Sequence, residues 1–253
     1  MQLTVTVCEL PDDPVAFTDA WVALRDHTSA NSTDLLALDE APFDAWFARE
    51  PEFDPSTWRR AVERKRLGAE DLRFECAVIG TMPVDHEGRR HQRSFSWSPS
   101  DGLAPWRFKA YLPDEEDVWE ASWYEPVPDE PDLRSIADAQ VGVLICTELW
   151  KFEWAGRMGR LGAQLIATPR ATGTDSVDKW LTGGRAAAIS AGAFSLSSNR
   201  AGGPFGGHGW IISPDGDILA ETDEGSPFVT VTIDLTDADL AKATYPRYAL
   251  WRR

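Results

Sequence analysis

One stretch near the middle of the chain indicates the fold: residues 141–173, VGVLICTELWKFEWAGRMGRLGAQLIATPRATG. Its first five residues are apolar or small, and Cys146 follows them directly. An aromatic-rich segment typical of a helix comes next, and a second apolar run begins at Gln164. The order strand, cysteine, helix, strand predicts neighbouring parallel strands in an α/β domain. Loops at the ends of such strands build active sites, and a nearby helix start can lower a thiol pKa, so Cys146 is the first candidate functional residue.

The rest of the chain continues this pattern. It has 253 residues, 43% of them hydrophobic, which is enough for a full core. Strands are predicted at residues 3–7, 34–38, 74–82, 93–97, 194–198 and 228–233, and helices start at Pro14, Pro55 and Ser176. The proline-rich loop 125–131 is too short to link two domains, so a single α/β domain spanning residues 1–253 is expected.

The charge of the protein argues against two classes of partner. Asp and Glu number 41 against 25 Lys and Arg, which gives a net charge of −16. Sequence-independent nucleic-acid binding and docking to an anionic membrane both depend on basic residues, so no nucleic acid and no membrane partner is expected. Only 5 of the basic residues are lysines. Adaptation to high salt and an ordinary acidic surface are both compatible with this composition.

Compartment and cysteine usage point to a cytoplasmic protein with free thiols. No apolar run approaches the length of about 20 residues that a membrane span needs, and the first residues, MQLTVTVCELPDD, lack the basic and apolar regions of a secretion signal. Cys8, Cys76 and Cys146 are far apart and form no CxxC motif, so neither a disulfide framework nor a zinc site is indicated. The four histidines share no metal-ligand spacing.

Three stretches carry a further signal through their order and spacing. LLALDE ends at Glu40, FKAYLPDEEDVWEASWYEP contains Lys109, and VGVLICTELW contains Cys146. Together with LIATP, the Ser-Asn-Arg segment 198–200 and GHGWIISPDGDILAET, they make the sequence similar to the carbon-nitrogen hydrolase family, or nitrilase superfamily, over nearly its whole length. The resemblance implies a four-layer αββα sandwich and cofactor-free hydrolysis. It also implies a homodimer or higher homo-oligomer, docked in part through the aromatic C-terminal tail, residues 244–253.

The resemblance assigns roles that also make chemical sense. Hydrolysis of an amide is easier through a covalent thioester, for which Cys146 supplies the nucleophile and Glu40 the general base. Lys109 provides a positive charge for the oxyanion, together with the backbone N–H of Thr147. Glu120 matches a second glutamate of the family, which orients the lysine or the substrate. A buried structural role for Cys146 and solvated surface roles for the other three are the alternatives.

The segment after the nucleophile is expected to determine specificity. Thr147, Glu148 and Trp150 follow Cys146 closely, and Glu148 is a candidate partner for a cationic substrate group. Arg170 is instead a candidate partner for a carboxylate. True nitrilases commonly have tryptophan and glutamate after the cysteine, whereas this chain has Thr147 and Glu148, so an amide is favoured over a nitrile.

Several activities that use the triad Glu40, Lys109 and Cys146 remain alternatives to amide hydrolysis. A nitrilase, an N-carbamoyl hydrolase and an acyl transferase would all need this triad, and a catalytically silent binding or assembly module would retain only the fold. A pairing of Cys146 with His208 is disfavoured, because His208 lies in the glycine-rich segment GGPFGGHG. These glycines predict a tight loop rather than a phosphate-binding site, since no Lys-Ser or Lys-Thr pair follows them.

Overall fold

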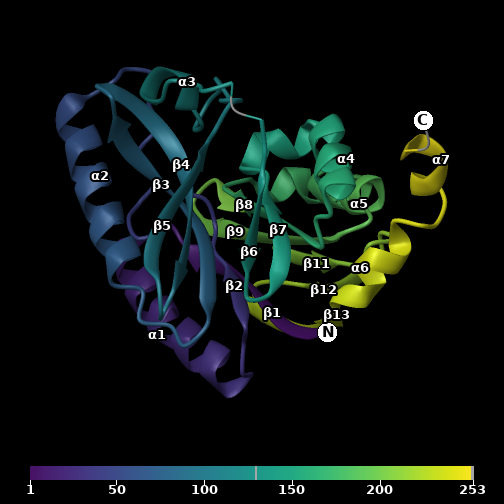
Figure 1. The fold of residues 1–253 in the computed structure, drawn as a ribbon. Helices are drawn as coiled ribbons and strands as arrows, with labels where there is room; N and C mark the ends of the chain where they lie inside the picture. Colours follow the sequence, from purple (N-terminus) through teal and green to yellow (C-terminus); the bar gives the residue numbers. More distant parts are fainter. Residues whose placement is uncertain (129, 252–253) are drawn as a thin grey trace.

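Two sheets share a single strand in the computed structural model, which describes residues 1–128 and 130–251. Residues 2–8 of β1 (Gln2–Pro11) pair antiparallel with β13 (Phe228–Asp234), and Val5 and Thr6 also pair in parallel with β2 (Leu35–Ala37). Its last residues, Glu9 to Pro11, pair in parallel with β9 (Phe194–Gly202) instead. The strand therefore passes from one sheet to the other and joins the two halves of the protein (Figure 1).

The first sheet continues from β2 through a hairpin to its edge. β3 (Ala77–His86) lies parallel to β2, and β4 (Arg89–Ser98) and β5 (Gly102–Phe108) follow antiparallel. The connection between the strands predicted at residues 74–82 and 93–97 is shorter than those bounds imply. Glu87 and Gly88, both with positive φ, form the turn, and the flanking polar residues extend the strands.

The second sheet contains the strand, helix and strand predicted from residues 141–173. β7 (Ala139–Val143) and β8 (Leu165–Arg170) are parallel, with α4 (Phe152–Leu161) between them in sequence. Directly after the strand, η1 (Cys146–Trp150) forms a short 3₁₀ helix. The other strands of this sheet are β6 (Leu133–Ile136), β9, β10 (Phe205–Gly206), β11 (Trp210–Ile212) and β12 (Ile218–Glu221).

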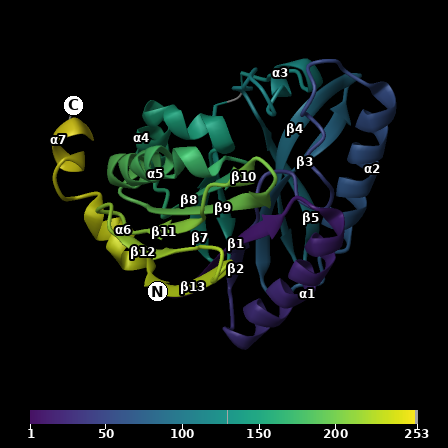
Figure 2. The ribbon, with the colours of Figure 1, turned by 180° about the vertical axis from the view of Figure 1, so that it is seen from behind.

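Apolar faces pack the molecule into four layers, which confirms the predicted αββα sandwich. The central core lies between the sheets and combines residues such as Val5 and Ile79 of the first sheet with Val143 and Leu196 of the second. Helices α1 (Pro14–Ala30) and α2 (Pro55–Glu70) cover the outer face of the first sheet, and α4 and α5 (Val177–Ala191) cover that of the second (Figure 2). None of the helices in the described part of the chain is long and apolar enough to cross a membrane.

The C-terminal segment is anchored to the rest of the chain. After α6 (Leu235–Ala241), the short helix α7 (Arg247–Trp251) begins at Arg247, which is 1% exposed and donates hydrogen bonds to the carbonyl oxygens of Ile189 and Pro214. Tyr245 and Leu250 are 76% and 71% exposed. Asp129 of the predicted loop and residues 252–253 of the predicted tail lie outside the described residues.

Candidate active site

Glu40 lies in a loop that buried cations hold in place. The residue follows β2, and its amide N–H donates to the carbonyl oxygen of Arg170 (3.1 Å). Arg200 donates to the carbonyl oxygens of Glu40 (3.2 Å) and Ala41, and Lys65 donates to three carbonyl oxygens of the same loop, including that of Asp44 (2.9 Å). Arg200 and Lys65 are almost fully buried. Their N–H groups provide hydrogen bonds for backbone oxygens that the loop would otherwise bury without partners.

Lys109 brings the two predicted glutamates together. It follows β5 directly, and its Nζ donates to Glu40 Oε1 (2.7 Å) and to both carboxylate oxygens of Glu120 (2.9 and 2.7 Å). Glu120 is the first residue of α3 (Glu120–Trp123). All three side chains are at most 2% exposed. Their placement joins a loop of the first sheet, its edge strand and a short helix at one point.

Burial and charge set the protonation of this cluster. Burial alone would lower the pKa of Lys109, but the carboxylates of Glu120 and Glu40 raise it well above its ordinary value, so the ammonium stays charged. Burial, together with the charge of Glu40, raises the pKa of Glu120 to about 8, against the opposing effect of Lys109. One ammonium thus faces two carboxyl groups, and burial favours the protonated form of Glu120.

Cys146 occupies a turn that places its sulfur at a cavity. It begins η1 with φ of +47°, a left-handed conformation that is rare for residues other than glycine and is found at functional sites. Burial, followed by the negative charge of Glu40, raises the pKa of the Cys146 thiol above its ordinary range, while Lys109 lowers it. The resting residue is a thiol, which needs a base for attack.

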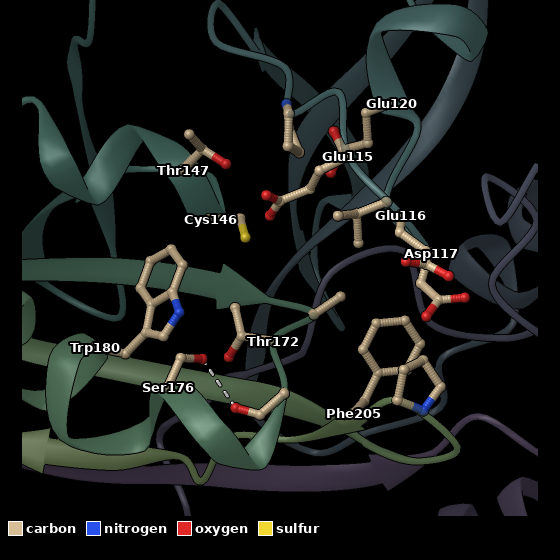
Figure 3. Close-up of a pocket in the computed structure, with 15 residues that line it drawn as sticks. Glu115, Glu116, Asp117, Glu120, Cys146, Thr147, Thr172, Ser176, Trp180 and Phe205 are labelled. Atoms are coloured by element: carbon tan, nitrogen blue, oxygen red, sulfur yellow. Dashed lines mark hydrogen bonds between the residues drawn. The ribbon is translucent and has the colours of Figure 1, made fainter. Parts of the chain in front are cut away.

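The cavity next to Cys146 has a volume of about 280 Å³ and two different sides. Trp180 and Phe205 contribute aromatic surface, and the loop between β5 and α3 contributes the carboxylates of Glu115, Glu116 and Asp117. Figure 3 shows the Cys146 sulfur pointing into the space between these groups. The remaining lining residues are Pro113, Val118, Glu120, Thr147, Ala171, Thr172, Gly173, Ser176 and Pro204.

The four predicted substrate-contacting residues divide between the cavity and the protein interior. Thr147 lines the cavity. Trp150 lies behind its wall, with its ring centroid 5.0 Å from that of Trp180. Glu148 and Arg170 are 0% exposed and do not line the cavity. The structure places these two in hydrogen bonds within the protein, in contrast to the prediction that they contact substrate.

The contacts of Arg170 explain its position. Its guanidinium donates to Ser197 Oγ (2.7 Å), Thr172 Oγ1 (2.7 Å) and the carbonyl oxygens of Gly207 and His208, and it lies 4.0 Å from the ring centroid of Trp210. The glycine-rich segment is thus a tight loop, as predicted, and Arg170 fixes it. With these contacts Arg170 is fully buried and is not among the residues that line the cavity.

The other cysteines and His208 lie outside the cavity. Cys8 and Cys76 are buried in the core beneath α1 and α2. His208 Nδ1 bonds to Glu221 Oε1 (2.7 Å), and no histidine is among the described residues that line the cavity.

Sequence reasoning missed Trp180, Phe205 and the three acidic residues of the 113–118 loop as parts of the cavity. Trp180 follows a helical pattern shared by ordinary packing residues, and Phe205 stands in a loop without periodicity. The acidic run was visible in the sequence, but 41 acidic residues gave no reason to select it. The signal that separates these residues is their proximity to Cys146 in space.

Sequence comparisons identify related proteins over most of the chain. The profile of the carbon-nitrogen hydrolase family matches residues 5–243. Glutamine-dependent NAD(+) synthetase from Rhodobacter capsulatus is 26% identical over 230 residues, which cover 87% of this chain and 40% of the relative. N-carbamoylputrescine amidase from Arabidopsis thaliana is 28% identical over 196 residues, covering 69% of this chain and 64% of the relative. The chain thus spans less than two thirds of either curated relative.

Solved structures share the fold at low sequence identity. A carbon-nitrogen hydrolase from Helicobacter pylori G27 superposes with a TM-score of 0.86 at 17% identity, covering 100% of this chain and 96% of the other. An amidase from Nesterenkonia sp. gives a TM-score of 0.74 at 18% identity, with coverage of 98% and 94%. Saccharomyces cerevisiae Nit3, of branch 10 of the nitrilase superfamily, gives 0.76 at 18% identity, with coverage of 97% and 94%.

Proposed function

Because the chain belongs to the carbon-nitrogen hydrolase family, we propose that it hydrolyses small linear amides through a thioester formed on Cys146. The observation that carries this proposal is the Lys109 ammonium, bonded to both Glu40 and Glu120 beside a cysteine that opens on a cavity. A buried cation, a carboxylate base and a thiol are the groups that acyl transfer requires. The likeness to an amidase and to N-carbamoylputrescine amidase supports the same reaction class.

In the acylation step, Glu40 takes the thiol proton while the sulfur attacks the amide carbonyl carbon. Its Oε2 has no hydrogen-bond partner among the described residues, so this oxygen is available to receive the proton. Lys109 and the backbone N–H of Thr147 stabilise the negative oxygen of the tetrahedral intermediate. Glu40 then gives the proton to the leaving nitrogen, the C–N bond breaks, and the amine departs from a thioester on Cys146.

In the deacylation step, water replaces the amine. Glu40 removes a proton from the water, the resulting hydroxide attacks the thioester, and the C–S bond breaks to give the carboxylic acid product. The proton held by Glu40 returns to the sulfur. Glu120 accepts hydrogen bonds from Lys109 through both oxygens, and in this scheme it keeps the ammonium aimed at the oxyanion throughout both steps.

The charge of the cavity favours a cationic or neutral acyl group over an anionic one. Glu115, Glu116 and Asp117 line one side, and none of the described lining residues is Lys, Arg or His. A carboxylate in this space would meet three like charges, whereas an ammonium would meet opposite charges and the aromatic surfaces of Trp180 and Phe205. We therefore propose short amides or N-carbamoyl compounds that carry an amino group as substrates.

The reaction is tested by ammonia release from a panel of linear amides, nitriles and N-carbamoyl amines. C146A should abolish turnover, and mass spectrometry of the wild-type protein quenched during turnover should find the acyl group on Cys146. C8A and C76A are the matched controls, since both thiols lie in the core away from the cavity, and both should retain activity. Turnover by C146A at the wild-type rate would refute the proposal.

The charge preference is tested with three amides of equal length that end in an ammonium, a methyl or a carboxylate group. We expect kcat/KM to be highest for the ammonium and lowest for the carboxylate, with a spread that narrows in high salt. The variant E115Q/E116Q/D117N should show a smaller spread of kcat/KM than the wild-type protein at low salt. A carboxylate substrate that is preferred by the wild-type protein would contradict the proposed substrate class while leaving the reaction class intact.

We also propose that the protein acts in the cytoplasm as a homodimer or higher homo-oligomer. Exposed apolar side chains in the C-terminal segment support self-association, with Leu240 67%, Tyr245 76% and Leu250 71% exposed. Sedimentation velocity of the wild-type protein and of Y245S/L250S should show association that the double variant weakens. A wild-type protein that sediments as a monomer at micromolar concentration would refute this proposal.

A further inference from the structure

One carboxylate connects the chain segments that carry Lys109 and Cys146. Glu148 Oε1 accepts from the backbone N–H of Ala110 (2.7 Å), the residue after Lys109. Glu148 Oε2 accepts from the backbone N–H of Ile145 (2.8 Å), the residue before Cys146. The side chain is 0% exposed and does not line the cavity. Each of its two oxygens thus holds the neighbour of a different active-site residue.

Arg107 completes this arrangement. Its guanidinium donates to both oxygens of Glu148, with Nη2 to Oε1 at 3.0 Å and Nη1 to Oε2. Arg107 belongs to β5, where its backbone N–H donates to Ser94 Oγ (3.2 Å) and its carbonyl oxygen accepts from the same hydroxyl (3.1 Å). The first sheet therefore supplies a fixed support for Glu148, and the charges of the buried pair compensate each other.

We infer that Glu148 is a positioning residue, which sets the distance between the Lys109 ammonium and the Cys146 sulfur by holding Ala110 and Ile145 at once. The inference rests on the proposed function, in which these two groups act on the same carbonyl. Lys109 comes from the edge of the first sheet and Cys146 from a turn after a strand of the second. Their spacing would otherwise depend on how the two sheets pack.

Only an ionised glutamate fits these four donors. A carboxylate offers about four lone-pair sites and no donor, which matches two backbone N–H groups and two guanidinium N–H groups. Glutamine would turn an NH₂ group toward one of these donors and lose that bond. Aspartate keeps the charge, but it is one methylene shorter and cannot reach both Ala110 and Ile145 from the same backbone position.

The position of η1 explains why the effect would be felt at the sulfur. The amide N–H of Glu148 donates to the carbonyl oxygen of Ile145 (3.1 Å), so the backbone and the side chain of Glu148 both form a hydrogen bond with Ile145. Cys146 lies between these two hydrogen-bonded residues in the turn, with φ of +47°. Loss of the side-chain bond would free a strained turn to relax toward a commoner conformation and move the sulfur from its base.

The test compares E148Q with E9Q, a matched change at another buried carboxylate. Glu9 is 7% exposed and accepts from Thr222 Oγ1 (2.5 Å), without a bond to either active-site segment. For each variant, kcat, KM and the rate of alkylation by iodoacetamide are measured, with mass spectrometry assigning the label separately to Cys8, Cys76 and Cys146. Alkylation needs no amide substrate, so it reports on Cys146 even if the substrate class is wrong.

We expect E148Q to lower kcat by about 100-fold, with KM changed by less than about threefold, because a displacement of about 1 Å has an effect of this size. Alkylation of Cys146 should slow by at least about tenfold, since the thiol is no longer aligned with its base. Cys8 and Cys76 should react as in the wild-type protein. E9Q should behave as wild type in all of these measurements.

A purely structural role gives the opposite pattern. General loosening would expose all three thiols and accelerate their alkylation, and this result for E148Q would overturn the inference, as would wild-type kcat and labelling. If E148Q does not fold, E148D is tested in its place. Alkylation of Cys146 in E148D at the wild-type rate would count against the inference, and slower alkylation of Cys146 alone would support it. A wild-type protein that hydrolyses no substrate, but whose Cys146 labelling depends on Glu148, would refute the proposed function alone.

Discussion

Replacement of Lys109 by methionine removes the cation that two buried carboxyl groups share. Its Nζ lies 2.7 Å from Glu40 Oε1 and 2.7 Å from Glu120 Oε2. At an effective dielectric constant of about 20, each such contact amounts to ~6 kcal/mol of attraction, most of which is offset by desolvation. Removing one partner of a buried ion pair typically costs about 3–5 kcal/mol. We expect K109M to lose this much free energy of unfolding at pH 8, together with all amide turnover.

The pH dependence separates this electrostatic loss from a packing defect. Lys109 opposes the rise in the pKa of Glu120, so its removal raises that pKa further, and the folded variant binds a proton more tightly than the unfolded chain does. Proton binding then stabilises the folded protein at low pH, and the stabilisation is lost as the pH rises through the folded-state pKa. The difference between wild type and K109M should therefore be smaller at pH 5 than at pH 8.

Urea denaturation followed by circular dichroism at both pH values measures these differences. The double variant K109M/E120Q provides the control, because it removes one carboxylate and should recover about half of the lost free energy at pH 8 without restoring activity. A K109M protein as stable as wild type at pH 8 would refute the reasoning. So would a loss that is equal at pH 5 and pH 8, since a cavity alone does not titrate.

Three further predictions concern the surroundings of the site. Burial raises the pKa of Asp39 from 3.8 to about 7, so protonation of Asp39 stabilises the folded state at low pH, and this stabilisation is lost as the pH rises toward 7. Between pH 4 and pH 7 the free energy of unfolding of the wild-type protein, measured by urea denaturation, should fall by on the order of 4 kcal/mol relative to that of D39N. Stability curves of the two proteins that run parallel over this pH range would contradict the prediction. W180A should raise KM by about tenfold, as expected for the loss of ~1.4 kcal/mol of contact, while Cys146 alkylation stays at the wild-type rate; an unchanged KM would exclude Trp180 from the substrate pocket. G159A should lower the free energy of unfolding by about 1–3 kcal/mol, because its methyl group would collide with the carbonyl oxygen of Ala191, and an unchanged Tm would show that α4 and α5 separate easily.

Much of the architecture was predictable because local patterns and packing agree. Helices α1 and α2 start at Pro14 and Pro55 as predicted, and the carboxylates of Asp13 and Asp54 cap them by accepting from the first free N–H groups. The apolar run at residues 141–145 predicts a buried strand, and β7 ends at Val143 within this run. The resemblance of short motifs then placed Glu40, Lys109 and Cys146 in one order, and the structure brings the first two within 2.7 Å.

The surroundings of these residues were less predictable, because they depend on contacts between distant segments. Glu148 and Arg170 were expected to contact substrate on the evidence of charge and proximity in sequence. A charged side chain next to a nucleophile can equally be held by backbone N–H or carbonyl groups, and only the three-dimensional position of residues such as Ala110 and His208 decides this. Trp180 is separated from Cys146 by a helix and a strand, so no spacing rule relates the two.

The passage of β1 from one sheet to the other affects the order in which the protein would lose activity and secondary structure on heating. Glu40 follows a strand of one sheet and Cys146 a strand of the other, and β1 is the strand common to both. A slight slip between the sheets would separate base from nucleophile while leaving each sheet intact. Thermal inactivation should therefore precede the loss of secondary structure, and substitutions in the central core, far from the cavity, should shorten the working temperature range of the enzyme before they lower its melting temperature.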